Sequence, residues 1–251
     1  MRLLLVSLAL LSAVHAPAWA DGDAKATAIG KEVWNALGGD AGWNQARYLR
    51  FDFIVERGGK QLVKRAHYWD RFSGRYRVDG VDDKGARYRV YFNVGTRVGE
   101  AWVNDVKLTD VAQAKKRIDE GYEAFINDSY WLLAPYKLFD AGVNLSYAGE
   151  DKGPSGEACD VLKLSFGSVG LTPKDIYWQL VDRASHRVVE WRFVLDGGKG
   201  PPSAFAWSDW HKVGSIQLAS TRTALGKPNA IRFGELAVSS TPDDAALTPP
   251  R

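Results

Sequence analysis

Segments in which large apolar side chains alternate with charged or polar ones most constrain what this chain can fold into. Residues 49–55 and 162–166 are clear examples, and turns containing Gly or Asp separate many of the segments. A period of two residues is the pattern of a β-strand with one face turned to a core. About eleven such segments occur, in two groups over residues 49–106 and 143–233. The pattern therefore predicts two antiparallel meanders with tight turns.

Two helical regions accompany the strands. Residues 24–37 carry apolar side chains at helical spacing, with Asp21 or Asp23 as the N-cap and a Gly-Gly stop. A second helical region begins at residues 109–110, and Asn127-Asp128-Ser129 is expected to interrupt or re-cap it. Each region has an apolar face, so both are predicted to lie against the sheet.

This order of elements predicts an α+β fold, specifically a strongly curved antiparallel half-barrel of about eleven strands with covering helices. A sheet of that width must curl, close or be covered, because wide, flat and exposed sheets are rare. No linker divides the chain, so residues 21–240 are expected to form a single domain. The proline-containing residues 241–251 are expected to be a disordered tail.

The first twenty residues have the pattern of a secretory signal peptide. Met1-Arg2 is followed by an apolar run over residues 3–14, and Ala18-Trp19-Ala20 is a small-x-small cleavage pattern. The apolar run is well short of the roughly 20 residues that cross a bilayer. Residues 1–20 are therefore predicted to be a signal peptide cleaved after Ala20. The mature chain is expected to lack a transmembrane anchor and to be periplasmic or secreted in a bacterium.

Composition excludes several functions. A single cysteine among 251 residues excludes intrachain disulfides and metal sites built from several cysteines. That cysteine, Cys159, begins a predicted strand and is expected to be buried and inert. The net charge of +3 is too balanced for a nucleic-acid binder, so no nucleic-acid partner is predicted.

The chain carries no recognisable catalytic or metal-binding motif. It lacks the GxSxG, HExxH and GxGxxG patterns. His67 and the pair Asp209 and His211 are the best candidates for a metal site or a scattered hydrolase site, if their strands bring them together. A place on the strand surface or rim is the favoured interpretation of these residues. We predict no catalytic residue, no metal and no cofactor.

The aromatic residues allow two interpretations. Many of them occupy the apolar positions of strands and helices, where they either fill a core or line an apolar groove between helices and sheet. The predicted groove residues are Trp34, Trp69, Phe125, Tyr130, Trp131, Trp178, Trp191 and Trp207.

Arginines gather in the first meander. They are interpreted as the solvated face of the sheet, or as a patch that meets anionic headgroups or an acidic partner. These residues are Arg65, Arg71, Arg75, Arg77, Arg87 and Arg89.

The order of helix, meander, helical region and second meander resembles that of the periplasmic carriers that sort outer-membrane lipoproteins. Local phrases are more similar to an uncharacterised group of bacterial secreted proteins. They are Asn127-Asp128-Ser129-Tyr130-Trp131-Leu132-Leu133, Lys137-Leu138-Phe139-Asp140, Gly142-Val143-Asn144-Leu145, Leu162-Lys163-Leu164-Ser165-Phe166, Thr172-Pro173-Lys174-Asp175-Ile176-Tyr177 and Asp182. The resemblance implies the same compartment and fold, but no activity.

Three functions follow from these observations. The first is a non-catalytic periplasmic carrier for a lipid, an acyl chain or a lipoprotein, in which burial of acyl carbons would supply the affinity. The second is a cell-envelope module that binds another protein and has a fully packed concavity. The third, and least favoured, is a hydrolase. An apolar cavity between helices and sheet would favour the first, and interlocked aromatic side chains would favour the second.

Overall fold

A computed structural model describes residues 23–166 and 174–250. The predicted signal peptide, with its cleavage point after Ala20, lies outside these residues, as do Thr172 and Pro173. The helices are α1 (Ala24–Ala36), α2 (Gly39–Gln45), α3 (Val111–Leu133), the 3₁₀ turn η1 (Ala134–Tyr136) and α4 (Asp244–Leu247).

All strands of the described residues belong to one antiparallel sheet. They are β1 (Tyr48–Arg57), β2 (Lys60–Asp70), β3 (Arg75–Val81), β4 (Arg87–Asn93), β5 (Gly99–Val103), β6 (Val106–Lys107), β7 (Val143–Lys152), β8 (Ala158–Phe166), β9 (Ile176–Asp182), β10 (Val188–Val194), β11 (Ser203–Val213), β12 (Ile216–Ala224) and β13 (Asn229–Ser239). Their order is β6-β5-β4-β3-β2-β1-β13-β12-β11-β10-β9-β8-β7. Each meander forms one half of the sheet, and the pairing of β1 with β13 joins the halves.

The predicted fold class, a half-barrel of about eleven strands, is wrong. Thirteen strands are present among the described residues, and the sheet is open because its two edge strands, β6 and β7, do not pair. The turn at Asn104 and Asp105 explains part of the difference. Both residues adopt positive φ, and this turn divides a short segment into the paired strands β5 and β6. The two residues of β6 are too few to show alternation in the sequence.

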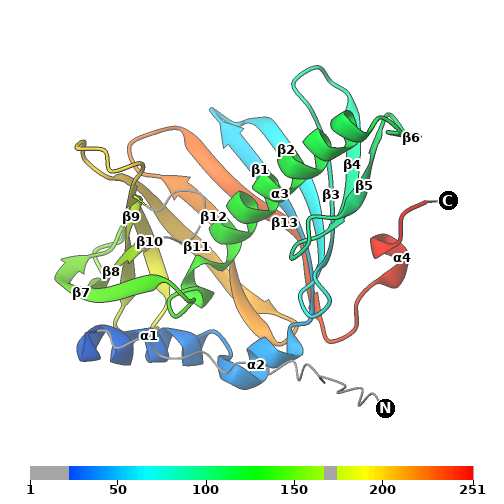
Figure 1. The fold of residues 1–251 in the computed structure, drawn as a ribbon. Helices are drawn as coiled ribbons and strands as arrows, with labels where there is room; N and C mark the ends of the chain where they lie inside the picture. The colour runs from blue at the N-terminus through cyan, green and yellow to red at the C-terminus, as the bar shows by residue number, and fades with distance from the viewer. Residues whose placement is uncertain (1–22, 167–173, 251) are drawn as a thin grey trace, which may run out of the picture.

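Helix α3 crosses one face of the sheet, while α1 and α2 lie along one end of the strands (Figure 1). We call the face covered by α3 the inner face and the opposite one the outer face. Toward its N-terminus α3 packs on β3, β4 and β5, and it also contacts β12. Of the two N-cap candidates for α1, Asp23 accepts hydrogen bonds at the start of the helix, and the side chain of Asp110 does so for α3.

Two local expectations differ from the structure. Helix α3 runs through residues 127–129 without interruption, because Asp128 satisfies its carboxylate with side chains of the sheet instead of capping the backbone. The segment 241–250, expected to be disordered, contains α4, whose Leu247 is only 5% exposed. Asp243 caps this turn by accepting a hydrogen bond from the amide of Ala246.

Candidate functional site

The predicted groove aromatics of the second meander pack tightly against one another. The ring of Trp131 on α3 meets that of Trp191 edge-on, with 4.5 Å between centroids, and that of Phe205 at 5.0 Å. Trp191 also contacts Trp207 and Tyr130. Edge-to-face contacts at these distances are favourable ring geometry. Trp191 and Trp207 are 3% and 4% exposed, so the inner face is filled with side chains at this point.

The remaining predicted groove residues lie in three other places. Trp69 of β2 and Phe125 of α3 pack edge-on at 5.1 Å and join α3 to the first meander. Trp34 lies on α1 and packs against Trp43 of α2. Trp178 is opposite Arg192 in the sheet and packs with an outer-face cluster that includes Leu180. The eight residues therefore do not form one continuous surface.

A buried polar network joins α3 to the sheet. The guanidinium of Arg65 makes two hydrogen bonds to the carboxylate of Asp128, at 2.6 and 2.7 Å. The same carboxylate lies 2.9 Å from Nε2 of His67, and the His67 ring stacks on Phe51. Nδ1 of His67 is 2.7 Å from the hydroxyl of Tyr76. One arginine, one carboxylate, one imidazole and one phenol thus form a continuous chain.

Burial and hydrogen bonding shift the pKa values of the ionisable groups in this network. Burial lowers the pKa of His67, and the neighbouring Asp128 carboxylate does not reverse the shift. Burial opposes ionisation of Asp128, but the hydrogen bonds from His67 and Arg65 prevail and lower its pKa. A neutral imidazole with Nε2 protonated can donate to Asp128 while Nδ1 accepts from Tyr76. His67 and Asp128 are both fully buried, so neither side chain reaches solvent.

The sequence interpretation missed this network. Asp128 occupies a position on the apolar stripe of α3, seven residues after Gly121 and four before the buried Leu132. An acidic residue on such a stripe needs a buried partner, and this was the available signal. The structure does not bring His67 to Asp209 and His211. Three strands separate β2 from β11, a distance of roughly 19 Å at the usual strand spacing.

A second buried cation closes the C-terminal end of α3. Arg222 of β12 is fully buried and donates to the carbonyl oxygens of Trp131 and Ala219 at 3.0 and 2.9 Å. Its guanidinium lies 3.5 Å from the ring centroid of Trp207 and 5.0 Å from that of Phe233. Carbonyls at the end of a helix need donors, and aromatic faces attract cations. No carboxylate among the described residues pairs with this arginine.

Cys159 lies on the outer side of β8 and is fully buried. Burial raises the pKa of its thiol to about 11. The thiolate is the reactive form, so a thiol with a raised pKa is a poor nucleophile. This agrees with the prediction of a buried and inert cysteine.

Four of the six predicted surface arginines project from the outer face. Arg65 instead points inward to Asp128, and Arg71 stacks on Trp43 with 3.6 Å between the guanidinium and the ring centroid. On the outer face, the ring of Tyr68 lies between two guanidinium groups, those of Arg50 and Arg77, each 4.5 Å from its centroid. Cross-strand pairing builds this ladder of cations and rings from β1 to β3.

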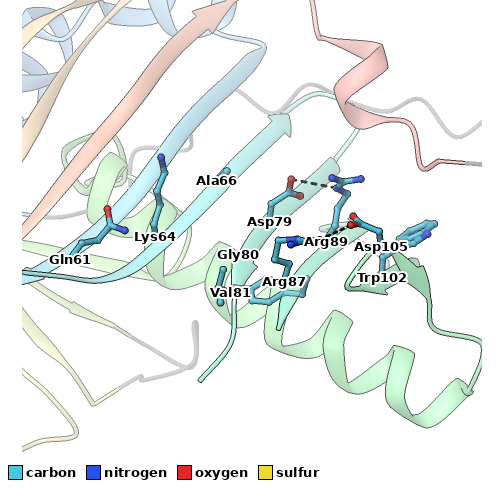
Figure 2. A pocket seen from close by; sticks show the side chains of 11 residues that line it. Gln61, Lys64, Ala66, Asp79, Gly80, Val81, Arg87, Arg89, Trp102 and Asp105 are labelled. Carbon is cyan, nitrogen blue, oxygen red and sulfur yellow. Dashed lines mark hydrogen bonds and ion pairs between the residues drawn. The ribbon is translucent and has the colours of Figure 1, made fainter. Parts of the chain in front are cut away.

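A shallow trough of about 370 Å³ lies on this outer face over β2, β3, β4 and β5. Figure 2 shows Lys64 on one side of the trough and Arg87 and Arg89 on the other. Its other lining residues are Gln61, Ala66, Asp79, Gly80, Val81, Tyr88, Trp102 and Asp105.

Each cation of the trough has a carboxylate partner, but the two arginine pairs are exposed or long. Arg87 pairs with Asp105 at 2.9 Å, but both side chains are about two-thirds exposed. Nε of Arg89 is buried, lies 3.5 Å from Asp79 and makes no hydrogen bond to a described residue. The carboxylate of Asp79 already accepts hydrogen bonds from both Nε and Nη2 of Arg77.

A second cleft, of about 490 Å³, opens between α3 and the strands β2, β3 and β4. Arg65 and Arg117 line it, and both arginines have partners: Arg65 binds Asp128, while Arg117 contacts Asp82 and Glu120 at 3.1 and 3.0 Å. Both arginines of this cleft are thus held by close carboxylate partners. Among the described residues no group of three or more His, Cys, Asp or Glu side chains is arranged to hold a metal ion.

The fold class is thus a single wide antiparallel sheet, packed by a long helix on its inner face and carrying charged side chains over much of the outer face of the first meander. The sequence matches no protein-family model, and no curated protein is significantly similar to it. The fold is similar to that of a DUF1329 family protein from Desulfovibrio piger, with a TM-score of 0.51 and 14% identity. That similarity covers 89% of this chain and 97% of the other.

Two structures of MucB are more distant. One has a TM-score of 0.33 and 15% identity, covering 91% of this chain and 64% of MucB. The other, the Pseudomonas aeruginosa MucA/MucB complex, has a TM-score of 0.30 and 14% identity, covering 88% and 61%. Scores this low carry no argument about this chain. The comparisons thus support a fold shared with a DUF1329 family protein, and the resemblance to lipoprotein-sorting carriers stays a prediction. None of the described helices combines the length and hydropathy needed to cross a bilayer.

Proposed function

We propose that this protein is a non-catalytic module of the bacterial cell envelope that acts by binding another protein, with a packed core in place of a lipid groove. The observation that carries this proposal is the packing of Trp131. Its ring contacts Trp191, Phe193 and Phe205, so side chains fill this part of the inner face between α3 and the sheet.

The energetics of this packing favour a permanent core. A lipid entering here would have to displace ring contacts that are already close and well oriented. Arg222 and Asp128 both hold the C-terminal third of α3 to the sheet, so this part of the helix does not act as a loose lid. The predicted signal peptide supports the envelope location. The buried state of His67 supports a function without covalent chemistry.

The lipid content of the protein tests the proposal directly. The full chain is expressed with its own leader, purified from the envelope fraction and measured by native mass spectrometry. We expect the mass of residues 21–251 without a bound lipid, and no saturable binding of a fluorescent fatty acid. A stoichiometric lipid, or saturable acyl-probe binding, would overturn the proposal in favour of the carrier.

A cross-linking experiment tests the protein partner. A photoreactive amino acid is placed at Val81, which is 58% exposed beside the trough, and, as a matched control, at Leu195, which is 55% exposed in the other half of the sheet. In cells of the source bacterium we expect a discrete heteromeric adduct from Val81 and none from Leu195. Absence of an adduct from both positions counts against a protein partner.

A further inference from the structure

The trough on the outer face has the features of a site for carboxylate groups. Lys64 reaches Asp52 at 2.8 Å and remains half exposed, while the Arg89 side chain is 36% exposed and its Nε lies 3.5 Å from Asp79 without a hydrogen bond. A partly exposed guanidinium that is only loosely paired can bind an incoming carboxylate. The exposed pair of Arg87 with Asp105 contributes little to stability, so Arg87 can exchange its partner at small cost.

The shape of the trough follows from the order of side chains across the strands. One cross-strand row on the outer face runs from Asp52 through Ala66 and Asp79 to Arg89 and Trp102. Ala66 is the smallest side chain of this row and leaves space between the cations on either side. Figure 2 shows this space between Lys64 and the two arginines of β4.

The chain already binds an acidic segment of its own on the same face. Asp244 of α4 accepts a hydrogen bond from Arg75 at 2.5 Å, and the carbonyl oxygen of Ala246 accepts one from Arg77 at 3.0 Å. Arg77 also engages Asp79, which lines the trough. The arginines of β3 thus show how this face holds a short acidic peptide, through carboxylate and backbone contacts together.

A membrane surface fits these observations less well. Trp102 and Tyr91 are 6% and 5% exposed, so neither ring is available to enter a lipid headgroup layer. Partly satisfied cations in a fixed arrangement suit individual carboxylates better than a diffuse negative surface.

We propose that the trough binds an acidic peptide segment of a partner protein, with Lys64, Arg87 and Arg89 contacting its carboxylates. This inference rests on the proposed function and specifies where the partner is recognised and by which chemistry.

The test uses a short, end-capped and fluorescently labelled peptide of alternating glutamate and alanine, with its glutamine–alanine counterpart as the control. Fluorescence anisotropy measures peptide binding to the full mature chain. We expect the glutamate peptide to bind, and the Arg87→Gln/Arg89→Gln variant to bind about tenfold more weakly. Arg232→Gln removes an exposed arginine of β13 that pairs with Glu56, and is expected to leave binding within about twofold of wild type.

Three results would overturn the inference: equal binding of both peptides, unchanged binding by the double variant, or sedimentation with phosphatidylglycerol vesicles in the absence of peptide binding. Circular dichroism of each variant establishes that it folds. Failure here is distinct from failure of the proposed function, which is judged by lipid content and by the Val81 adduct. If that adduct forms equally in the double variant, the partner does not depend on Arg87 and Arg89, and only the assignment of these arginines to carboxylate binding is lost.

Discussion

Asp128 of α3 and Arg65 of β2 form a two-pronged ion pair, with nitrogen–oxygen distances of 2.6 and 2.7 Å, beneath the helix that crosses the sheet. The pair links a helix to a strand far from it in the sequence. Asp128 is fully buried and the Arg65 side chain is 22% exposed, so the carboxylate depends on its protein partners. The stability of the whole α3–sheet interface is therefore expected to depend on this contact.

Asp128→Asn should destabilise the protein by about 3 kcal/mol, because it leaves the Arg65 guanidinium and His67 facing a neutral amide in a buried site. Urea unfolding followed by circular dichroism measures the change. Asp119→Asn, which removes an exposed carboxylate paired with Lys115 on the same helix, should change stability by less than about 0.5 kcal/mol. Equal effects of the two substitutions would show that the buried Asp128–Arg65 pair does not stabilise the α3–sheet interface more than an exposed pair does.

Stability should fall as the pH is lowered below the pKa of an ordinary histidine, about 6.5. Burial lowers the pKa of His67 in the folded state, so below about pH 6.5 the unfolded chain binds a proton that the native protein does not. The free energy of unfolding therefore declines with falling pH until the folded pKa is reached. His67→Gln should reduce the slope between pH 7 and pH 5 by about 1 kcal/mol per pH unit. Tyr76→Phe keeps the buried imidazole and should retain the slope, and an unaltered slope in His67→Gln contradicts this reasoning.

Arg222→Lys should cost about 2 to 4 kcal/mol of stability, because a lysine cannot reproduce the planar set of donors that serves several carbonyl oxygens at once. The carbonyl of Trp131 at the end of α3 would lose its partners. Thermal unfolding measures the loss. The matched exposed substitution, Arg232→Lys on β13, should be close to neutral. A neutral Arg222→Lys would show that the guanidinium is not needed to close the helix.

Trp131→Ala should destabilise the protein by about 3 to 5 kcal/mol, because it opens a cavity among rings that are otherwise in contact. Near-ultraviolet circular dichroism should weaken at the same time, since the surrounding aromatics lose their fixed packing. Trp178→Ala, on the outer face, should cost less because Trp178 packs against the small outer-face cluster of Cys159, Val161 and Leu180 and not among the rings around Trp131. A Trp131 variant as stable as wild type would mean that the inner face is not a packed core.

Leu247→Ala should cost about 2 kcal/mol, because Leu247 is nearly buried in α4 although it stands near the end of the chain. Faster hydrogen exchange at the amide of Ala246, which is bonded to Asp243, should accompany the loss. Leu225→Ala, at a position 42% exposed, serves as the control and should be nearly neutral. If Leu247→Ala is silent in both measurements, the C-terminal segment is not held on the outer face.

Much of the local structure was accessible from the residues themselves. Alternation located most strands, and Asp23 and Asp110 marked the starts of two helices. The sequence pattern identified the aromatic residues as a set but could not assign them to a core or a groove. Alternation shows which side of a strand is apolar, but it does not show what fills the space next to that side. Asp128 was misjudged, since local rules treat an Asn-Asp-Ser sequence as a helix cap.

The sequence by itself determined the period-two segments and the helix starts, because these depend on neighbours along the chain. Its single cysteine also excluded intrachain disulfides. Only the tertiary structure decided that β1 pairs with β13, that Phe53 lies opposite Phe233, and that the two meanders become one open sheet. Contacts between residues so far apart carry no local signature, since their free energy comes from burial and pairing after the chain has closed a long loop. Burial and pairing of the same kind placed Asp128 beside Arg65 and His67, and left the two arginines of the outer trough in exposed or long ion pairs.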